Sequence, residues 1–301
     1  MVSNERNTDS EEGRRKPSRL ALLGLVRFTA FLASLMLFLA VLILPRAASA
    51  AFDFSVSHPK GEFQLKPGEH ATRALWVNND SDETIRITAY LGDWIMDAKG
   101  NEDYLEPGTI ERSLCSWVTV SPSVFSIAAH SSHQVFYEVS VPEDTALEGS
   151  YWGMIFIEKE PPPVARRDAD EGRPSVAIRA IVRYGVRLLL TVPGTEIRQA
   201  GFISSAATPT EEGFTLTALL RNDGNIYLRP LVWLELRDVA GEVIHSENHR
   251  LLTVLPENER EYSFDLSGLQ LSAGKYVAIV FADIGMPNLI GAQCDIEVDG
   301  E

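Results

Sequence analysis

Six histidines are the first residues to consider for chemistry in this sequence, as metal ligands or as general bases. His130 and His133 are three residues apart, and His245 and His249 are four apart. Such spacings place two imidazoles on one face only in a helix, and we expect both pairs to lie in strand edges or loops. No cysteine or acidic residue completes a metal-binding set at the usual spacing. We therefore expect no metal site and no catalytic histidine.

Other motifs of catalysis are missing as well. The sequence contains no G-x-S-x-G, no H-E-x-x-H and no phosphate-binding glycine loop. Asp80, Asp82 and the run from Asp168 to Glu171 could bind calcium, but carboxylates in turns usually accept local hydrogen bonds and keep the surface soluble. We predict a binding protein that is not an enzyme and that holds no cofactor.

The first fifty residues have the layout of an export signal. Basic residues precede an apolar run from Phe28 to Leu44, and Ala48-Ser49-Ala50 supplies the small residues for cleavage after Ala50. The run has 17 residues, the lower limit for crossing a bilayer, so an uncleaved membrane anchor is the alternative. In both cases we expect the remaining chain to be exported, to the periplasm or to the cell surface.

The exported part, residues 51–301, is long enough for two domains and is acidic. Removing the 7 basic and 4 acidic residues of the leader from totals of 27 and 42 leaves 20 Lys and Arg against 38 Asp and Glu. Such a surface is a poor partner for nucleic acid and keeps an exported protein soluble. The two cysteines, Cys115 and Cys294, either pair between the domains or remain separate buried thiols.

A long alternating segment, Val176 to Val192, lies near the middle of the exported part. Its even-numbered residues are all apolar, and its odd-numbered ones include Arg179, Arg183 and Arg187. This period of two predicts a β-strand. At about 3.3 Å per residue the strand would span roughly 55 Å, so we expect it to bend, at Gly185. A helix is the alternative, because the three arginines are four residues apart.

Short alternating segments separated by turns make up the rest of the exported part. Before Pro193-Gly194 there are about seven of them, the strand count of an immunoglobulin-like sandwich. The pattern then restarts and continues to the C-terminus. We predict an all-β fold with two tandem immunoglobulin-like β-sandwiches after the N-terminal signal or anchor segment. The predicted boundaries are 1–50 for that segment, 51–193 for the first sandwich and 194–301 for the second.

The segments before Pro193 resemble a known family. The runs that carry the resemblance are Phe54-Ser-Val-Ser, Lys66-Pro67-Gly68, Trp76-Val-Asn-Asn-Asp80, Trp117-Val-Thr-Val-Ser-Pro122 and Tyr151-Trp152. Together with the long last strand, they resemble the N-terminal domain of periplasmic pilus-assembly chaperones, the PapD-like family. Some of them, with Tyr184 to Leu188, are also similar to the first domain of WxL-interacting cell-surface proteins of Gram-positive bacteria.

The chaperone resemblance implies a function and a site. In that family the last strand of the first domain is added to an incomplete pilin sandwich, and two basic residues in the cleft between domains hold the pilin's terminal carboxylate. Arg187 falls at the position of the basic residue on the last strand. Alignment on the Lys66-Pro67-Gly68 turn puts Glu62 at the first-strand position, where an acidic residue would repel a carboxylate, and Lys60 two residues away.

We therefore predict an exported chaperone or adaptor that binds a secreted or surface protein subunit, of the pilus type, by β-strand addition. The residues expected to contact this partner are Ile178, Ala180, Val182, Tyr184, Arg187 and Lys60. The second resemblance implies the alternative, a cell-envelope adhesion or peptidoglycan-binding module with the cell wall as its partner. Nucleic acid is not expected as a partner, and membrane contact is expected only through Phe28 to Leu44.

Overall fold

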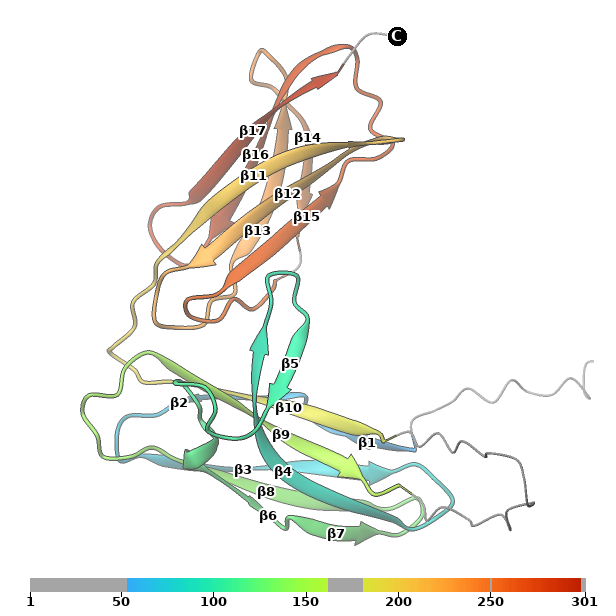
Figure 1. The fold of residues 1–301 in the computed structure, drawn as a ribbon, viewed down its shortest axis with the longest axis vertical. Helices are drawn as coiled ribbons and strands as arrows, with labels where there is room; N and C mark the ends of the chain where they lie inside the picture. The colour runs from blue at the N-terminus through green and yellow to red at the C-terminus, as the bar shows by residue number, and fades with distance from the viewer. Residues whose placement is uncertain (1–52, 162–180, 250, 299–301) are drawn as a thin grey trace, which may run out of the picture. The chain divides into compact units, whose positions relative to one another are not determined.

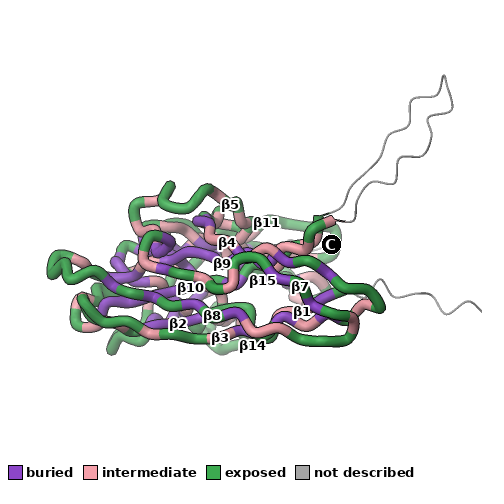
Figure 2. The backbone as a smooth tube through the Cα atoms, turned by 90° about the horizontal axis from the view of Figure 1, so that it is seen from below, coloured by how far each residue is buried: buried purple, intermediate pink, exposed green. Residues whose placement is uncertain are grey.

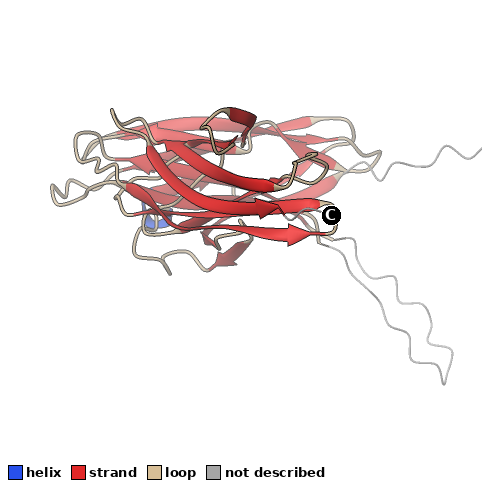
Figure 3. Cartoon of the chain, turned by 90° about the horizontal axis from the view of Figure 1, so that it is seen from above, coloured by secondary structure: helices blue, strands red, loops and turns tan. Residues whose placement is uncertain are grey.

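A computed structural model describes residues 53–161, 181–249 and 251–298. In these residues nearly all regular structure is β-strand, with one short 3-10 helix, η1 (Cys115–Trp117) (Figures 1 and 3). The predicted leader with Phe28 to Leu44, and the predicted contact residues Ile178 and Ala180, lie outside the described residues. Within the described ranges, no helix has the length and apolar character needed to cross a membrane.

The first group of strands forms two sheets. One has the order β1-β3-β8-β6, and the other has the order β2-β10-β9-β4-β5, with β7 paired to β4. The bounds are β1 (Phe54–Val56), β2 (Lys60–Gln64), β3 (His70–Asn79), β4 (Ile85–Met96), β5 (Glu102–Leu105), β6 (Val118–Ser121), β7 (Val124–Ile127), β8 (Ser132–Ser140), β9 (Ser150–Lys159) and β10 (Arg183–Thr191). The inward residues of both sheets share one apolar core, as in an immunoglobulin-like sandwich.

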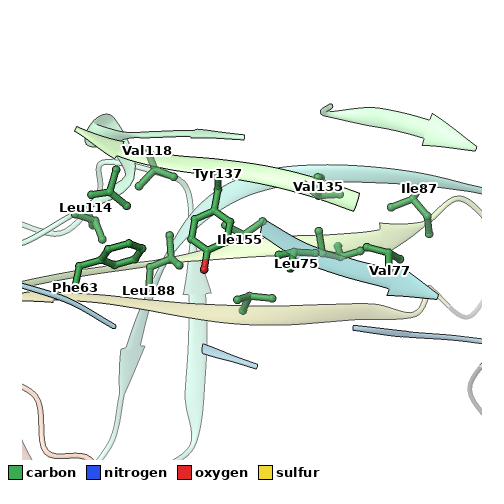
Figure 4. Packing of buried hydrophobic residues seen from close by; sticks show 14 of the residues in the cluster. Phe63, Leu75, Val77, Ile87, Leu114, Val118, Val135, Tyr137, Ile155 and Leu188 are labelled. Carbon is green, nitrogen blue, oxygen red and sulfur yellow. The ribbon is translucent and has the colours of Figure 1, made fainter. Parts of the chain in front are cut away.

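Strand β10 contributes alternate residues to this core. Val186, Leu188 and Leu190 are 1%, 0% and 0% exposed, and Figure 4 shows Leu188 among the packed side chains of the cluster. The period of two predicted for Val176 to Val192 is thus confirmed as a strand from Arg183 to Thr191, and the helical alternative is wrong for these residues.

The opposite face of β10 is covered near its C-terminal end, at Leu189. Leu189 is 2% exposed because it packs in a second cluster with Trp94 and Trp152. This cluster also contains Leu255, from the second half of the chain. Strict alternation between apolar and polar residues therefore ends where both faces of the strand are buried.

The second group of strands forms two further sheets, with the orders β11-β12-β15 and β14-β13-β16-β17. The bounds are β11 (Ala200–Thr210), β12 (Gly213–Asn222), β13 (Leu231–Arg237), β14 (Val243–Asn248), β15 (Glu259–Asp265), β16 (Gly274–Asp283) and β17 (Ile290–Val298). Their inward side chains form a separate apolar core. In Figure 2, buried positions (purple) recur along the strands of the first group, which lie in front in that view. The predicted all-β fold of two tandem immunoglobulin-like sandwiches is confirmed. Phe52–Glu301 form one compact unit, and the boundary at Pro193-Gly194 stays a prediction.

The segment at the start of the first sandwich divides between its two sheets. Strand β1 pairs antiparallel with β3, whereas β2 pairs parallel with β10. In the second pairing Lys60 is the register partner of Arg187, and Gln64 is the partner of Thr191. The switch therefore brings two basic residues together that are far apart in the sequence.

The two cysteines do not form a disulfide. Cys115 is buried beside the Asp93 carboxylate, and Cys294 is half-buried in the other core. Burial, together with the hydrogen bond to Asp93, raises the pKa of the Cys115 thiol to about 12. Both residues therefore agree with the prediction of separate thiols, and Cys115 stays protonated at neutral pH.

The carboxylate of Asp93, which is 0% exposed, organises the loop that follows β5. It accepts hydrogen bonds from the backbone N–H groups of Thr109 and Ile110, at 2.7 and 3.1 Å. The Ser113 hydroxyl and the Cys115 thiol donate to the other carboxylate oxygen, at 2.6 and 3.1 Å. A single buried side chain therefore satisfies four donors, which would otherwise be unpaired.

We expect Asp93→Asn to destabilise the protein by about 1–3 kcal/mol, because an amide replaces one acceptor oxygen with a donor that faces other donors. Urea unfolding followed by tryptophan fluorescence would measure the loss. Asp103→Asn, an exposed residue on β5, is the matched control and should change stability little. Equal stability of the two variants would contradict the assigned role of Asp93.

Candidate partner-binding site

Part of strand β10 has an unpaired edge. Its pairing with β9 extends from Arg183 to Thr191, but its pairing with β2 begins only at Arg187. No other strand in the described part of the chain pairs with β10. We call the backbone groups of Arg183 and Gly185, on the side away from β9, the open edge.

The direction of the backbone groups along β10 follows from two hydrogen bonds. The Lys159 N–H donates to the Val182 carbonyl at 3.1 Å, and the Arg187 N–H donates to the Pro59 carbonyl at 3.0 Å. Successive residues of a strand turn their backbone groups to opposite sides, so Arg183 and Gly185 face the same side as Arg187. These two residues therefore present N–H and C=O groups at the open edge, where an incoming strand could pair with them.

The side chains next to the open edge are held by the first sandwich. Val182 and Tyr184 pack against its core, and the Tyr184 hydroxyl donates to the Phe54 carbonyl at 2.9 Å. The guanidinium of Arg183, an exposed residue, lies 5.0 Å from the ring centre of Tyr104 and 4.7 Å from that of Phe156. Of the apolar contact residues predicted from sequence, the two that are described turn inward, and what remains open is the backbone. Their role in contacting a partner stays a prediction.

A cavity of about 450 Å³ lies at the end of the open edge. Four basic side chains line it, from β2, β10, the segment before β13, and β15: Lys60, Arg187, Arg229 and Arg260. We call this cavity the basic cleft. Its local positive charge contrasts with the formal net charge of −15 for the whole chain. An anion is the ligand that this arrangement favours.

Arg187 is held in the basic cleft by two contacts. Its Nε donates to the Glu102 carboxylate at 2.8 Å, and a second guanidinium nitrogen lies 2.5 Å from the same oxygen. The guanidinium also lies 5.6 Å from the ring centre of Trp94, which is fully buried. The β4–β5 hairpin therefore positions the Arg187 head group, which keeps 47% of its side chain exposed.

Glu62 lies between two of the basic residues. Its carboxylate is 3.1 Å from the Lys60 ammonium and forms an ion pair with Arg229. Burial alone would raise the pKa of Glu62, but the hydrogen bonds from Arg229 and Lys60 outweigh it and hold the pKa below its ordinary value. Lys60, and not Glu62, is the register partner of Arg187, and a role of these two residues in binding a carboxylate stays a prediction. Glu62 is neutralised locally rather than left to repel an anion.

Sequence reasoning did not find Arg229 or Arg260. Arg260 alternates with Tyr262 and Phe264, which are buried in the second core, so it is a basic residue at an inward strand position. An arginine in an otherwise apolar alternation was a signal in the sequence that could have identified Arg260. Arg229 lies between strands, where an arginine is common, so no sequence signal identified it.

Solved structures that resemble this chain include fimbrial chaperones. The class 5 fimbriae chaperone CfaA has a TM-score of 0.42 and 13% identity, covering 80% of this chain and 98% of that one. The E. coli chaperone DraB has a TM-score of 0.39 and 16% identity, covering 82% of this chain and 96% of that one. A Salmonella enterica complex of the SafA pilin with the SafB chaperone has a TM-score of 0.38 and 16% identity, covering 82% of this chain and 99% of that one. The resemblance to pilus-assembly chaperones named from the sequence is thus found again among solved structures. No family model and no curated protein matches the chain.

We expect Glu62→Gln to lower stability at neutral pH and to have little effect in acid. Because the pKa of Glu62 is lowered in the folded state, its stabilising contribution is present above the unfolded pKa, about 4.3, and is lost as pH falls through the folded value. Urea unfolding between pH 3 and pH 7 would show the difference between wild type and variant shrinking below about pH 4.5. Glu111→Gln, at an exposed position, is the control. A difference that does not vary with pH would contradict the ion pairs.

Proposed function

We propose that this protein is an exported, non-enzymatic chaperone or adaptor that binds an extended segment of a secreted or surface subunit, of the pilus type. The segment would be added as a strand at the open edge of β10, and its C-terminal carboxylate would be bound by Lys60 and Arg187. The observation that carries the proposal is the continuity of the open edge with the basic cleft.

The direction of the bound segment follows from β2. This strand runs parallel to β10 and pairs with its edge from Arg187 onward. A partner segment that pairs with the same edge of β10, and also runs parallel to it, must end where β2 begins. Its last residue would then lie beside Lys60 and Arg187, so a free carboxylate at that end would meet two cations.

The affinity of such a segment has two sources. Main-chain hydrogen bonds to Arg183 and Gly185 would pair its backbone, and alternate side chains would contact the sandwich surface around the edge. Ile178 and Ala180 lie outside the described residues, and their contact with the partner stays a prediction. The carboxylate adds a charge-assisted hydrogen bond and fixes the register.

Replacing Arg183 by proline tests strand addition. The substitution removes an N–H that points away from β9, so it should leave the fold intact while blocking pairing at the open edge. The probe is a fluorescent decapeptide that alternates valine with threonine and ends in a free carboxylate, measured by anisotropy. We expect Arg183→Pro to weaken binding about tenfold or more.

Arg183→Ala is the matched control for this variant. It removes the same side chain, with its contacts to Tyr104 and Phe156, but keeps the backbone N–H. We expect it to bind the peptide nearly as well as wild type. Equal binding by the alanine and proline variants would overturn strand addition at this edge.

The carboxylate contact is tested separately with the same peptide as an acid and as an amide. Wild type should prefer the acid by about tenfold or more, since a hydrogen bond to a charged group contributes about 1.5–3 kcal/mol. Lys60→Gln combined with Arg187→Gln should abolish that preference. Lys66→Gln combined with Arg86→Gln changes the net charge equally at exposed positions and should leave the preference for the acid unchanged. A preference that survives the first pair would remove Lys60 and Arg187 from the site.

A further inference from the structure

Arg260 is a buried cation that has no acidic partner among the described residues. The residue is 9% exposed, and its Nε has no hydrogen-bond partner in the described structure. One of its terminal nitrogens donates to the Met96 sulfur at 2.8 Å, which is a weak acceptor. Among the described residues no carboxylate forms an ion pair with it, whereas Glu62 and Glu102 pair with the other three cations of the basic cleft.

The turn between β4 and β5 is shaped around this guanidinium. Gly100 has a φ of +91°, and a Cβ at this position would overlap the guanidinium group of Arg260. The backbone N–H of the next residue along β15, Glu261, donates to the Ala98 carbonyl at 2.8 Å. The position of Arg260 is therefore fixed by both its own strand and the hairpin, and its side chain lines the basic cleft.

Such an arrangement is costly for the folded protein. Burying a charge is unfavourable unless it is paired, and Met96 does not compensate a guanidinium. The charges of the cleft point to what would compensate it. Four cations face two carboxylates, so two positive charges are left over. A single terminal carboxylate at Lys60 and Arg187 would neutralise one of them.

We infer that Arg260 is a second anion site in the basic cleft, which binds a second carboxylate of the same partner segment. The chemistry fits an aspartate or glutamate at the last position of that segment, whose side chain and C-terminus supply two carboxylates a few ångströms apart. The planar guanidinium can accept a carboxylate on two nitrogens at once. This inference rests on the proposed function for its partner, but its first test does not.

The first test uses small anions in place of the partner. Succinate carries two carboxylates and acetate one, so at equal ionic strength succinate should raise the melting temperature of wild type by about 2 °C or more above acetate. Arg260→Met should lose this difference, and Arg260→Lys should keep part of it. Arg221→Met, at an exposed arginine paired with Asp223, should retain it in full.

Arg260→Met also separates an anion site from a structural role. If Arg260 serves to bind an anion, removing an unpaired buried charge should leave the melting temperature without anions unchanged or higher. A lower melting temperature with an unchanged succinate effect would mean that Arg260 only supports the Gly100 turn. No succinate effect in wild type, or equal effects in wild type and Arg260→Met, would overturn the inference.

The second test uses the decapeptide with aspartate or asparagine as its last residue. Wild type should bind the aspartate peptide about 10- to 100-fold more tightly, and Arg260→Met should bind both equally. A preference unchanged by Arg260→Met would overturn the second site while leaving strand addition intact. Failure of every peptide to bind wild type would count against the proposed function, and the succinate comparison would then decide the role of Arg260 alone.

Discussion

The parallel pairing of β2 with β10 is the constraint on which the candidate site depends. It begins at Lys60 and Arg187, so it determines both where the open edge stops and which basic residue lies beside Arg187. If β1 and β2 formed one continuous strand against β3, Lys60 would lie in the other sheet and the whole edge of β10 away from β9 would lack a partner strand. The short break between the two strands therefore creates both the edge and the cleft at its end.

The basic cleft shows how a strongly acidic chain keeps a local cation cluster in place. Four positive side chains around a cavity of about 450 Å³ repel each other, and the repulsion is strongest where water is excluded. Glu62 and Glu102 reduce this repulsion. Glu62 pairs with Lys60 on its own strand and with Arg229, and Glu102 on β5 pairs with Arg187 on β10. Among the described residues that line the cavity, Glu102 is the acidic one and four are basic, so an anionic partner would find a favourable field there.

Much of the fold could be predicted from the sequence because burial on a strand repeats every two residues. Val186, Leu188 and Leu190 were predicted to share one face of a strand, and they do. The all-β class and the two sandwiches followed from the same period. The sequence did not predict that Val182 and Tyr184 pack against the core of their own sandwich. An apolar alternation shows which residues share a face but not what covers that face.

The sequence by itself determined the strand period, the acidic charge and the position of Arg187 on the last strand of the first sandwich. Only the tertiary structure decided which residue pairs with it, since the register between β2 and β10 joins segments more than a hundred residues apart. The same holds for Arg260, whose place in the cleft depends on contact between β15 and the β4–β5 turn. Local patterns record which residues are buried, whereas a binding site is made by long-range contacts that no local pattern contains.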